Sequence, residues 1–467
     1  MRYEIHALAT IAFLAPSLEA ATIRVPDDQP TIGAGLGAAT DGDTVLVAHG
    51  TYEGPGNREL RFGAKQVVLR SEWGAEYTVI DGQDRDDEKI FVFDEDVTSE
   101  TIVEGFTIRN GAYAGGGCAM DLNFASPNIV DCVFESNEPQ GIGAGGGGAL
   151  SVWGGSEPVF LRCRFLDNTA YTAGAVYCAH AARPRFVGCY FEGNSAGGTG
   201  GAICSSGSSV PKLLDCLFVE NSAAHRGGAV YAYESDIEIV NCTFVDHQAE
   251  DGTVLWSTLS DPLVSGSILT GSSEPVFAIF GAPAVSYSDV EGGYSGQGNI
   301  DADPLFEDPA GDNYRLSADS PCIDAARPGE SDACLPPGLG SSLADIGAYG
   351  GEYNCLWLAD CDIQLELSNL PTSVSPGETI AITASATNGC EGRSYFDEAI
   401  AELTDPGAAS ISLYEGSPIY LGPGGEMQAQ IELTVPLGAP AGIYQAMIVI
   451  LREGEPIDAV RFTVEVS

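Results

Sequence analysis

Positive charge is scarce in this sequence. Among 467 residues there are only 20 lysines and arginines, against 66 aspartates and glutamates, so the net charge is −46. A protein that binds nucleic acid needs a basic face to neutralise phosphates, and docking on an anionic membrane needs clustered cations. The charge balance therefore argues against nucleic acid as a partner and disfavours a membrane surface. It fits a soluble, secreted protein.

A long hydrophobic run is also missing. No stretch reaches the roughly 18 apolar residues that a transmembrane helix requires, so we expect no transmembrane segment. The shorter apolar run at residues 7–16 follows Arg2 and precedes the small residues Ala20 and Ala21. We interpret residues 1–21 as a secretory signal peptide, the alternative being an N-terminal strand. The expected location is secreted or cell-surface, that is, extracellular or associated with an outer membrane.

Glycine is abundant, with 59 residues, and the middle of the chain repeats. The motif Val/Leu-x-Cys-x-Phe-x-x-Asn occurs five times, its phenylalanines 31, 26, 27 and 26 residues apart, and His247 replaces the last asparagine. A Gly-Ala motif keeps the same period. Repeats of about 20–50 residues indicate a stacked architecture. The repeated positions are Cys132, Cys163, Cys189, Cys216 and Cys242, with Asn137, Asn168, Asn194 and Asn221.

Within each unit the pattern alternates with period two, as in a strand. Val130, Cys132 and Phe134 share one face, while Asp131 and Val133 take the other. A unit of this length holds two or three short strands, and stacking such units gives a parallel β-helix with rungs about 4.8 Å apart. We expect the cysteines to form an inward column and the asparagines a ladder that bonds to backbone along the stack. A propeller blade would need about 40–45 residues.

The Gly-Gly-Ala-Ile/Val and Phe-x-x-Asn motifs resemble polymorphic outer membrane protein repeats. More broadly, the chain resembles right-handed parallel β-helix repeat proteins of the pectin-lyase-like superfamily. Residues 23–54 resemble the short capping helix and first rung of such proteins, and residues 299–350 resemble their closing segment. The resemblance implies a β-helix with an N-terminal cap over residues 22–355. It implies no single function, because the superfamily holds lyases, hydrolases, esterases, adhesins and passive stalks.

The repeat stops near Asp362, and alternating strands follow. Five are expected, at residues 363–367, 379–386, 427–435, 443–451 and 460–466, with Pro-Gly turns between them. This spacing is typical of an immunoglobulin-like or fibronectin-like β-sandwich. The predicted fold class is therefore all-β, with a β-helix followed by a C-terminal sandwich at residues 362–467.

The 13 cysteines leave two alternatives open. Stacked thiols lie within disulfide range, yet in-register stacking points their Cβ vectors in parallel, which favours free buried thiols over bridged pairs. No Cys-x-x-Cys spacing occurs, so we expect no metal at the cysteines. In the later, loop-like part, Cys322 with Cys334 is the first predicted disulfide.

Catalytic signatures are not found. The Gly-His-Gly and Arg-Ile-Lys motifs of polygalacturonases are absent, and Phe244 and His247 fall in the repeat's own columns. We name no catalytic residue and expect no organic cofactor. Acidic turns would suit calcium, the alternative being solvated carboxylates. These turns contain Asp81, Asp84, Asp86, Asp87, Glu88, Asp94 and Asp96, and later Asp301 and Asp303.

Aromatic residues give the one binding hypothesis. Tyr177 and Tyr231 occupy the same column of the Gly-Ala strands, and Trp153 and Tyr233 share their parity two residues further on. Exposed aromatic rings form patches that bind ligands, although the rings could instead pack beneath a loop or the tail domain. We therefore expect an exported, non-catalytic protein with a structural, adhesive or glycan-binding role, whose partner is a polysaccharide or cell-surface glycan. The alternative is a polysaccharide lyase or glycoside hydrolase acting on acidic polysaccharides such as pectin.

Overall fold

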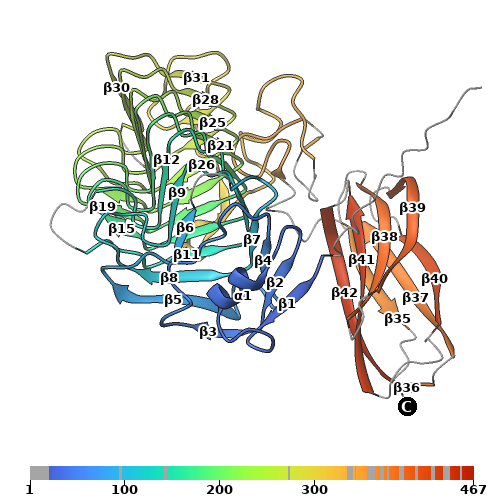
Figure 1. Ribbon diagram of the computed structural model, residues 1–467. Helices are drawn as coiled ribbons and strands as arrows, with labels where there is room; N and C mark the ends of the chain where they lie inside the picture. Colours follow the sequence, from blue (N-terminus) through green and yellow to red (C-terminus); the bar gives the residue numbers. More distant parts are fainter. Residues whose placement is uncertain are drawn as a thin grey trace, which may run out of the picture.

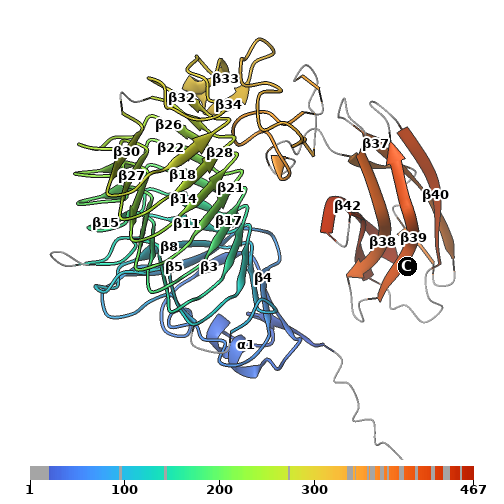
Figure 2. The same cartoon turned by 90° about the horizontal axis from the view of Figure 1, so that it is seen from above.

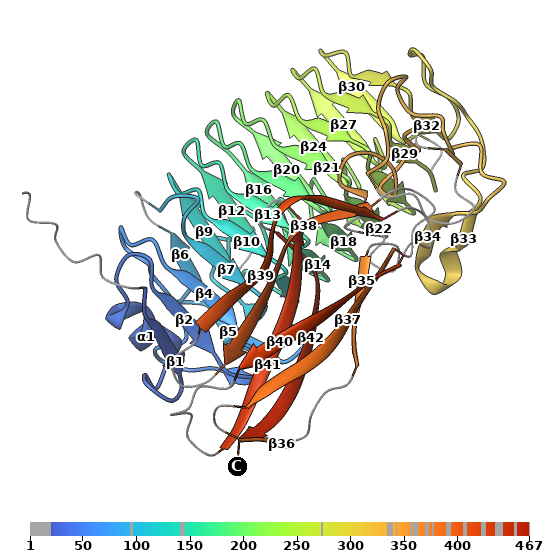
Figure 3. The ribbon, with the colours of Figure 1, turned by 90° about the vertical axis from the view of Figure 1, so that its right-hand side faces the viewer.

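The computed structural model describes residues 20–93, 97–140, 145–271, 274–333, 340–341, 343–354 and 357, together with the strands between residues 363 and 466. Short parallel strands stack into three long sheets, and each turn of the chain adds one strand to each sheet in succession (Figure 1, Figure 3). This confirms the predicted parallel β-helix. Among the described residues, no helix has the length and hydropathy needed to cross a membrane.

Sheet A has 11 strands, in the order β1 (Thr22–Val25), β2 (Thr44–Val47), β4 (Val68–Ser71), β7 (Ile102–Glu104), β10 (Asn128–Val130), β13 (Val159–Leu161), β17 (Arg185–Val187), β21 (Lys212–Leu214), β25 (Glu238–Val240), β28 (Leu263–Ser265) and β31 (Ala284–Ser286). Sheet B has 10, in the order β3 (Gly50–Tyr52), β5 (Thr78–Arg85), β8 (Thr107–Gly111), β11 (Val133–Glu135), β14 (Arg164–Leu166), β18 (Tyr190–Glu192), β22 (Leu217–Val219), β26 (Thr243–Val245), β29 (Ile268–Leu269) and β32 (Asp289–Val290).

Sheet C has 8 strands, β6 (Phe91–Phe93), β9 (Met120–Asn123), β12 (Leu150–Trp153), β16 (Val176–Cys178), β20 (Ile203–Ser206), β24 (Val230–Tyr233), β27 (Leu255–Thr258) and β30 (Val276–Ile279). A short fourth sheet contains β15 (Thr169–Ala170), β19 (Ser195–Ala196) and β23 (Ser222–Ala223). Helix α1 (Ile32–Ala38) lies at the N-terminal end of the stack, as the capping motif predicts (Figure 2). Thr31 caps it by accepting a hydrogen bond from the N–H of Ala34.

The turn from sheet A to sheet B corrects one detail of the predicted alternation. Asp131 and Cys132 lie between β10 and β11, and Asp131 adopts the left-handed conformation, with a φ of 50°. This turn changes the parity of the chain. Ile129, Cys132 and Phe134 therefore point inward and are buried, whereas Val130 faces outward and is half-buried.

The interior is built from uniform rows. Phe134, Phe165, Phe191, Phe218 and Phe244 are fully buried, and their rings stack with centroids 4.4–4.8 Å apart. Such spacing follows from rungs about 4.8 Å apart. The five cysteines of the repeat are buried and free, so the free-thiol alternative is correct. Their sulfur atoms lie against backbone carbonyls, as Cys189 does against Phe160 O at 3.3 Å.

The asparagines form a hydrogen-bonded ladder along the stack. The Asn137 N–H and Nδ2 both donate to Asn168 Oδ1, at 3.1 and 3.0 Å, and Asn168 bonds to Asn194 in the same way. His247 continues the ladder, because its Nδ1 accepts from the Asn221 N–H at 3.0 Å. Burial lowers the pKa of His247 to about 3, so its ring is neutral. A neutral histidine can therefore take the place of asparagine here.

The end of the β-helix is covered by β33 (Phe306–Asp308), the short 3₁₀ helix η1 (Pro309–Gly311), β34 (Asn313–Leu316) and a closing segment, residues 343–357, of which 343–354 and 357 are described. This segment lies against the outer face of sheet B. The Gly347 N–H donates to Gly266 O at 2.7 Å, and the Ala348 N–H donates to Thr243 Oγ1 at 2.9 Å. Ala348 and Tyr349 also pack with Val245 in an apolar cluster.

The C-terminal strands form a three-stranded and a five-stranded sheet that are antiparallel except where β36 pairs with β42. Their bounds are β35 (Ile363–Ser368), β36 (Ser373–Val374), β37 (Thr379–Asn388), β38 (Ser394–Thr404), β39 (Ala409–Leu421), β40 (Glu426–Thr434), β41 (Gly442–Arg452) and β42 (Glu455–Val466). The five predicted strands correspond to β35, β37, β40, β41 and β42. The predictions missed β36, β38 and β39.

Candidate functional site

The outward side chains of sheet C form a row that crosses the rungs. Strand pairing places these residues in register, one per rung, and we call them the outer row: Asp121, Ser151, Tyr177, Cys204, Tyr231, Trp256 and Phe277. The structure thus places the two predicted tyrosines, Tyr177 and Tyr231, in one column, with Cys204 between them. Trp153 and Tyr233 lie on the same outward face, two residues further along their strands.

Much of the outer row packs against itself. The rings of Tyr231 and Trp256 are parallel within 1°, with centroids 4.9 Å apart, and Trp256 is only 3% exposed. The ring face of Tyr231 that a sugar would need is therefore covered by a neighbouring rung. The Tyr177 hydroxyl bonds to Ser206 Oγ at 3.1 Å. Tyr233 remains 39% exposed.

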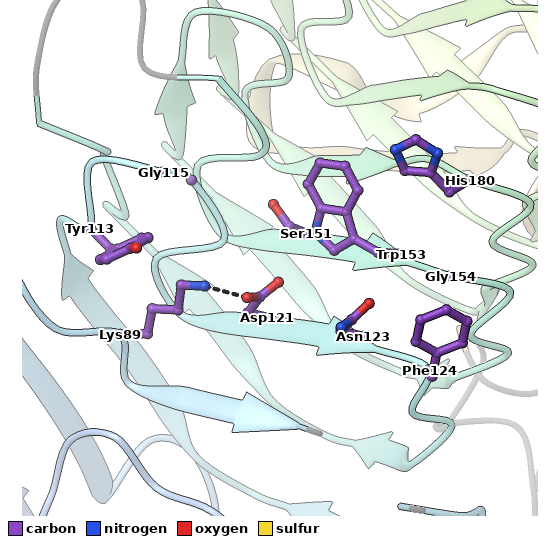
Figure 4. A pocket seen from close by; sticks show the side chains of 11 residues that line it. Lys89, Tyr113, Gly115, Asp121, Asn123, Phe124, Ser151, Trp153, Gly154 and His180 are labelled. Carbon is purple, nitrogen blue, oxygen red and sulfur yellow. Dashed lines mark hydrogen bonds and ion pairs between the residues drawn. The ribbon is translucent and has the colours of Figure 1, made fainter. Parts of the chain in front are cut away.

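Around Trp153 the same face is hollowed into a groove of about 540 Å³ (Figure 4). Its floor consists of β9 and β12, which present Asp121, Asn123, Ser151 and Trp153. Lys89 and Tyr113 lie at one end, and Phe124 and His180 lie at the other. The groove therefore runs along the strand direction, across the width of sheet C.

The first end of the groove is polar. Lys89 Nζ forms an ion pair with Asp121 and lies over the Tyr113 ring, 4.5 Å from its centroid. Both partners are largely shielded, with side-chain exposures of 16% and 20%. Because the two charges neutralise each other, this end offers hydrogen-bonding groups and an aromatic ring without a net charge.

The other end is aromatic. The Trp153 ring stacks on His180 at 5.6 Å and meets the edge of Tyr177 at 5.2 Å. Phe124 is 56% exposed and has a φ of 56°, an unusual conformation for a bulky residue. Gly154 lies beneath this ring in the left-handed conformation, with a φ of 64°, and a Cβ there would come within 2.8 Å of the Phe124 ring. The end therefore presents the stacked rings of Trp153 and His180 together with the exposed ring of Phe124.

Protein donors bind three carboxylates of the predicted calcium turns, those of Asp81, Asp301 and Asp303. Burial alone would raise the pKa of Asp81, but hydrogen bonds from the Gln83 N–H, Asn110 and Arg109 lower it. Asp301 accepts from the Gly292 N–H and Asp303 from the Leu305 N–H. Asp94 and Asp96 lie outside the described residues. Within the part of the chain that the structure describes, no three His, Cys, Asp or Glu side chains are grouped to hold a metal ion.

One further expectation needs correction. Cys322 is a buried free thiol, 3.3 Å from Asp289 Oδ2, and its predicted disulfide partner Cys334 lies outside the described residues. The residues directly before the repeat cysteines differ in exposure, and two of them, Asp215 and Asn241, are only 2% and 6% exposed. The closing segment covers these two, an arrangement that strand alternation alone does not reveal.

Sequence reasoning missed Lys89, Tyr113, Asp121, Phe124 and His180. Lys89 lies before the first repeat, and Tyr113 lies in a loop between rungs, so neither belongs to a repeated column. One signal was available, because the chain has only three lysines and Lys89 is one of them. A rare cation beside an aspartate-bearing strand could have marked this end of the groove.

The sequence comparison agrees with the architecture. Residues 144–269 match the family described as right handed beta helix region. Together with the stacked parallel sheets, this match identifies the central part of the chain as a right-handed parallel β-helix. A comparison with curated proteins finds no match.

Solved structures resemble the chain only weakly. The sporulation control protein of Bacillus subtilis is 12% identical over 23% of this chain, with a TM-score of 0.19. A β-glucosidase of Listeria innocua is 20% identical over 23% of this chain, with a TM-score of 0.17. The chain covers about half of the first structure, 49%, and 16% of the second. Similarities this weak say nothing about function.

Proposed function

We propose that this protein is an exported, non-catalytic β-helix protein that binds neutral glycans in the groove at Trp153. The observation that carries the proposal is the pairing of an aromatic end, Trp153 and Phe124, with a polar end in which Lys89 and Asp121 neutralise each other. Sugar rings present apolar faces and hydroxyl edges. Aromatic rings suit the faces, and side chains that donate and accept hydrogen bonds suit the edges.

Charge supports a neutral ligand over an acidic one. A chain of net charge −46 repels polyanions, and the one lysine in the groove is already paired. A lyase or hydrolase would also need a carboxylate or base poised for proton transfer. In this groove, Asp121 is held by Lys89. This arrangement favours binding over cleavage.

The test is a glycan array followed by calorimetric titration of the strongest hits. We expect Trp153→Ala to weaken binding by about tenfold or more, because aromatic anchors dominate binding energy. The matched control is Trp73→Ala, since Trp73 is 52% exposed and does not line the groove. Equal binding by the Trp153 variant and the native protein would contradict the proposed site.

A second measurement separates binding from catalysis. The bound glycan and acidic polysaccharides are incubated with the protein, and reducing ends and unsaturated products are assayed. We expect neither product. Sustained release of either one would favour the lyase or hydrolase alternative. Export is tested separately by N-terminal sequencing of protein recovered outside the cell, which we expect to begin near residue 22.

A further inference from the structure

A second region with unusual side-chain contacts is the turn between sheets A and B. Each rung places one left-handed residue there, and the column runs Asp131, Arg162, Gly188, Asp215 and Asn241, with φ between 50° and 57°. Consecutive members are stacked because the strands on both sides pair in register. Each side chain in this column therefore has its neighbours one rung below and one rung above.

The two carboxylates of this column, Asp131 and Asp215, have different neighbours. Asp131 receives a two-pronged ion pair from Arg162 on the next rung, with Nε–Oδ1 and Nη2–Oδ2 both 2.7 Å. Asp215 has Gly188 on one side and Asn241 on the other, so neither of its neighbours in the column carries a positive charge. The guanidinium that neutralises Asp131 therefore has no counterpart within the column at Asp215.

Asp215 is nonetheless the more deeply buried of the two. It is 2% exposed and Asn241 is 6% exposed, and in both residues the buried Oδ1 has no hydrogen-bond partner. The closing segment covers them. A Cβ on Gly351 would lie 3.3 Å from Asp215 Oδ1, and the Trp357 Nε1–H donates to the Asp215 carbonyl at 2.6 Å. Two buried acceptors without donors are costly, at about 1–3 kcal/mol each.

Asp215 and Asn241 also line a cavity of about 410 Å³, together with Arg185, Lys212, Glu238, Glu352 and Tyr353. Lys212 Nζ is bound to Glu238 Oε2 at 2.5 Å, and neither cation of the lining bonds to Asp215 Oδ1. Burial, Cys216 and the nearby Asp332 and Glu352 raise the pKa of Asp215, although Asn241 acts in the opposite direction. A cation entering the cavity would offset the repulsion of Asp215 by Asp332 and Glu352.

We propose that this cavity binds a guanidinium or primary ammonium group, whose N–H donors bond to Asp215 and Asn241. The chain already uses a guanidinium for the same purpose at Arg162, one column position away from Gly188. A calcium ion is a poorer match, because it takes about 6–8 oxygen ligands, and within the described part of the chain no three His, Cys, Asp or Glu side chains are grouped to hold a metal ion. The site is separate from the groove at Trp153 and does not depend on the proposed function.

The test uses the full chain and the indole N–H signals of its four tryptophans in a nitrogen-15 NMR spectrum. Trp357 reports on the site, because its indole bonds to the Asp215 carbonyl, and Trp357→Phe assigns its signal. Methylguanidinium and methylammonium chloride are the probes. Tetramethylammonium chloride is the control, since it carries the same charge without an N–H. We expect a saturable shift of the Trp357 signal with the two donors and none with the control.

Two variants locate the binding. Asp215→Asn should weaken the methylguanidinium response by about tenfold or more, because the charged acceptor is lost. Asp131→Asn removes a carboxylate from the same column and should leave the response unchanged. An equal shift with tetramethylammonium would reduce the effect to ionic screening, and a stronger saturable shift with calcium chloride would make the site a metal site. No shift with any probe would mean that Asp215 is protonated and bonded to Asn241. Each of these three results overturns the proposal, as would an undiminished response in Asp215→Asn.

Discussion

The inner and outer rows of this β-helix come from the same repeat but differ in how strictly they hold one residue type. The inner row keeps phenylalanine at Phe134, Phe165, Phe191, Phe218 and Phe244, whereas the outer row of sheet C changes at every rung from Asp121 to Phe277. Inside, each ring must fill the same space between two rungs. Outside, only the strand pairing is shared, so the outer row is free to carry a site.

Removing one inner ring should have the largest effect. Phe191 stacks on Phe165 at 4.6 Å and on Phe218 at 4.4 Å and is fully buried. We expect Phe191→Ala to lower the free energy of unfolding by about 3–5 kcal/mol, measured by urea denaturation. The control is Tyr171→Ala, because Tyr171 is 55% exposed, and its effect should stay within about 0.5 kcal/mol. A similar loss of unfolding free energy in both variants would contradict the expected difference between inner and outer aromatic residues.

The asparagine ladder should be the next most sensitive feature. Asn168→Ala removes the acceptor for the Asn137 N–H and Nδ2 and the donor to the Phe134 carbonyl. Buried groups left without partners cost free energy, so we expect a loss of about 2–3 kcal/mol in the same denaturation experiment. Asn123→Ala, on the exposed side of β9, is the matched control and should be nearly neutral. A loss below about 0.5 kcal/mol for Asn168→Ala would show that the ladder is not needed for stability.

The inner rows were predictable from sequence and the site was not, for physical reasons. If the rungs stack, then a cysteine, a phenylalanine and an asparagine that recur with the same period must stack as well. The repeat period therefore predicts all three rows of side chains. The turn at Asp131 was misjudged because one left-handed residue changes which neighbours face inward. The groove depends on Lys89 and Tyr113, which lie outside the repeat. The stacking of the Trp256 ring on Tyr231, which covers a predicted contact residue, was also not evident from the sequence. Ring orientations and loop positions depend on side-chain packing, which the repeat period of the sequence does not reveal.

The closing segment should detach from the outer face of sheet B more easily as the pH rises. Burial and repulsion by Asp332 raise the pKa of Asp345 to about 8, and burial raises that of Asp332 to about 7. A carboxyl whose pKa is raised on folding stabilises the closed segment fully below its unfolded value, near 3.8, and loses this effect as pH rises through the folded value. We therefore expect the segment to loosen between about pH 4 and pH 8, by up to about tenfold in its opening equilibrium per pH unit for each carboxyl.

Amide hydrogen exchange of Ile346, Gly347 and Ala348, corrected for the intrinsic rate, measures this opening. The inner strand β18 provides the reference, because its amides should show no comparable pH dependence. Asp345→Asn keeps an acceptor for the Asp324 N–H, which now lies 2.7 Å from Asp345 Oδ1, and should flatten the profile. Equal pH dependence in the native protein and this variant would assign the effect to another group.

The smallest effect is expected where the outer row is altered without removing a ring. Tyr177→Phe deletes only the hydroxyl that bonds to Ser206 Oγ at 3.1 Å and leaves the edge contact with Trp153 at 5.2 Å. A partly exposed hydrogen bond contributes about 0.5–1.5 kcal/mol, so the unfolding free energy should fall by about that much or less. Glycan binding should persist, because the wall beside Trp153 is unchanged. A loss above about 2 kcal/mol would mean that this outer hydroxyl supports the stack as an inner residue does.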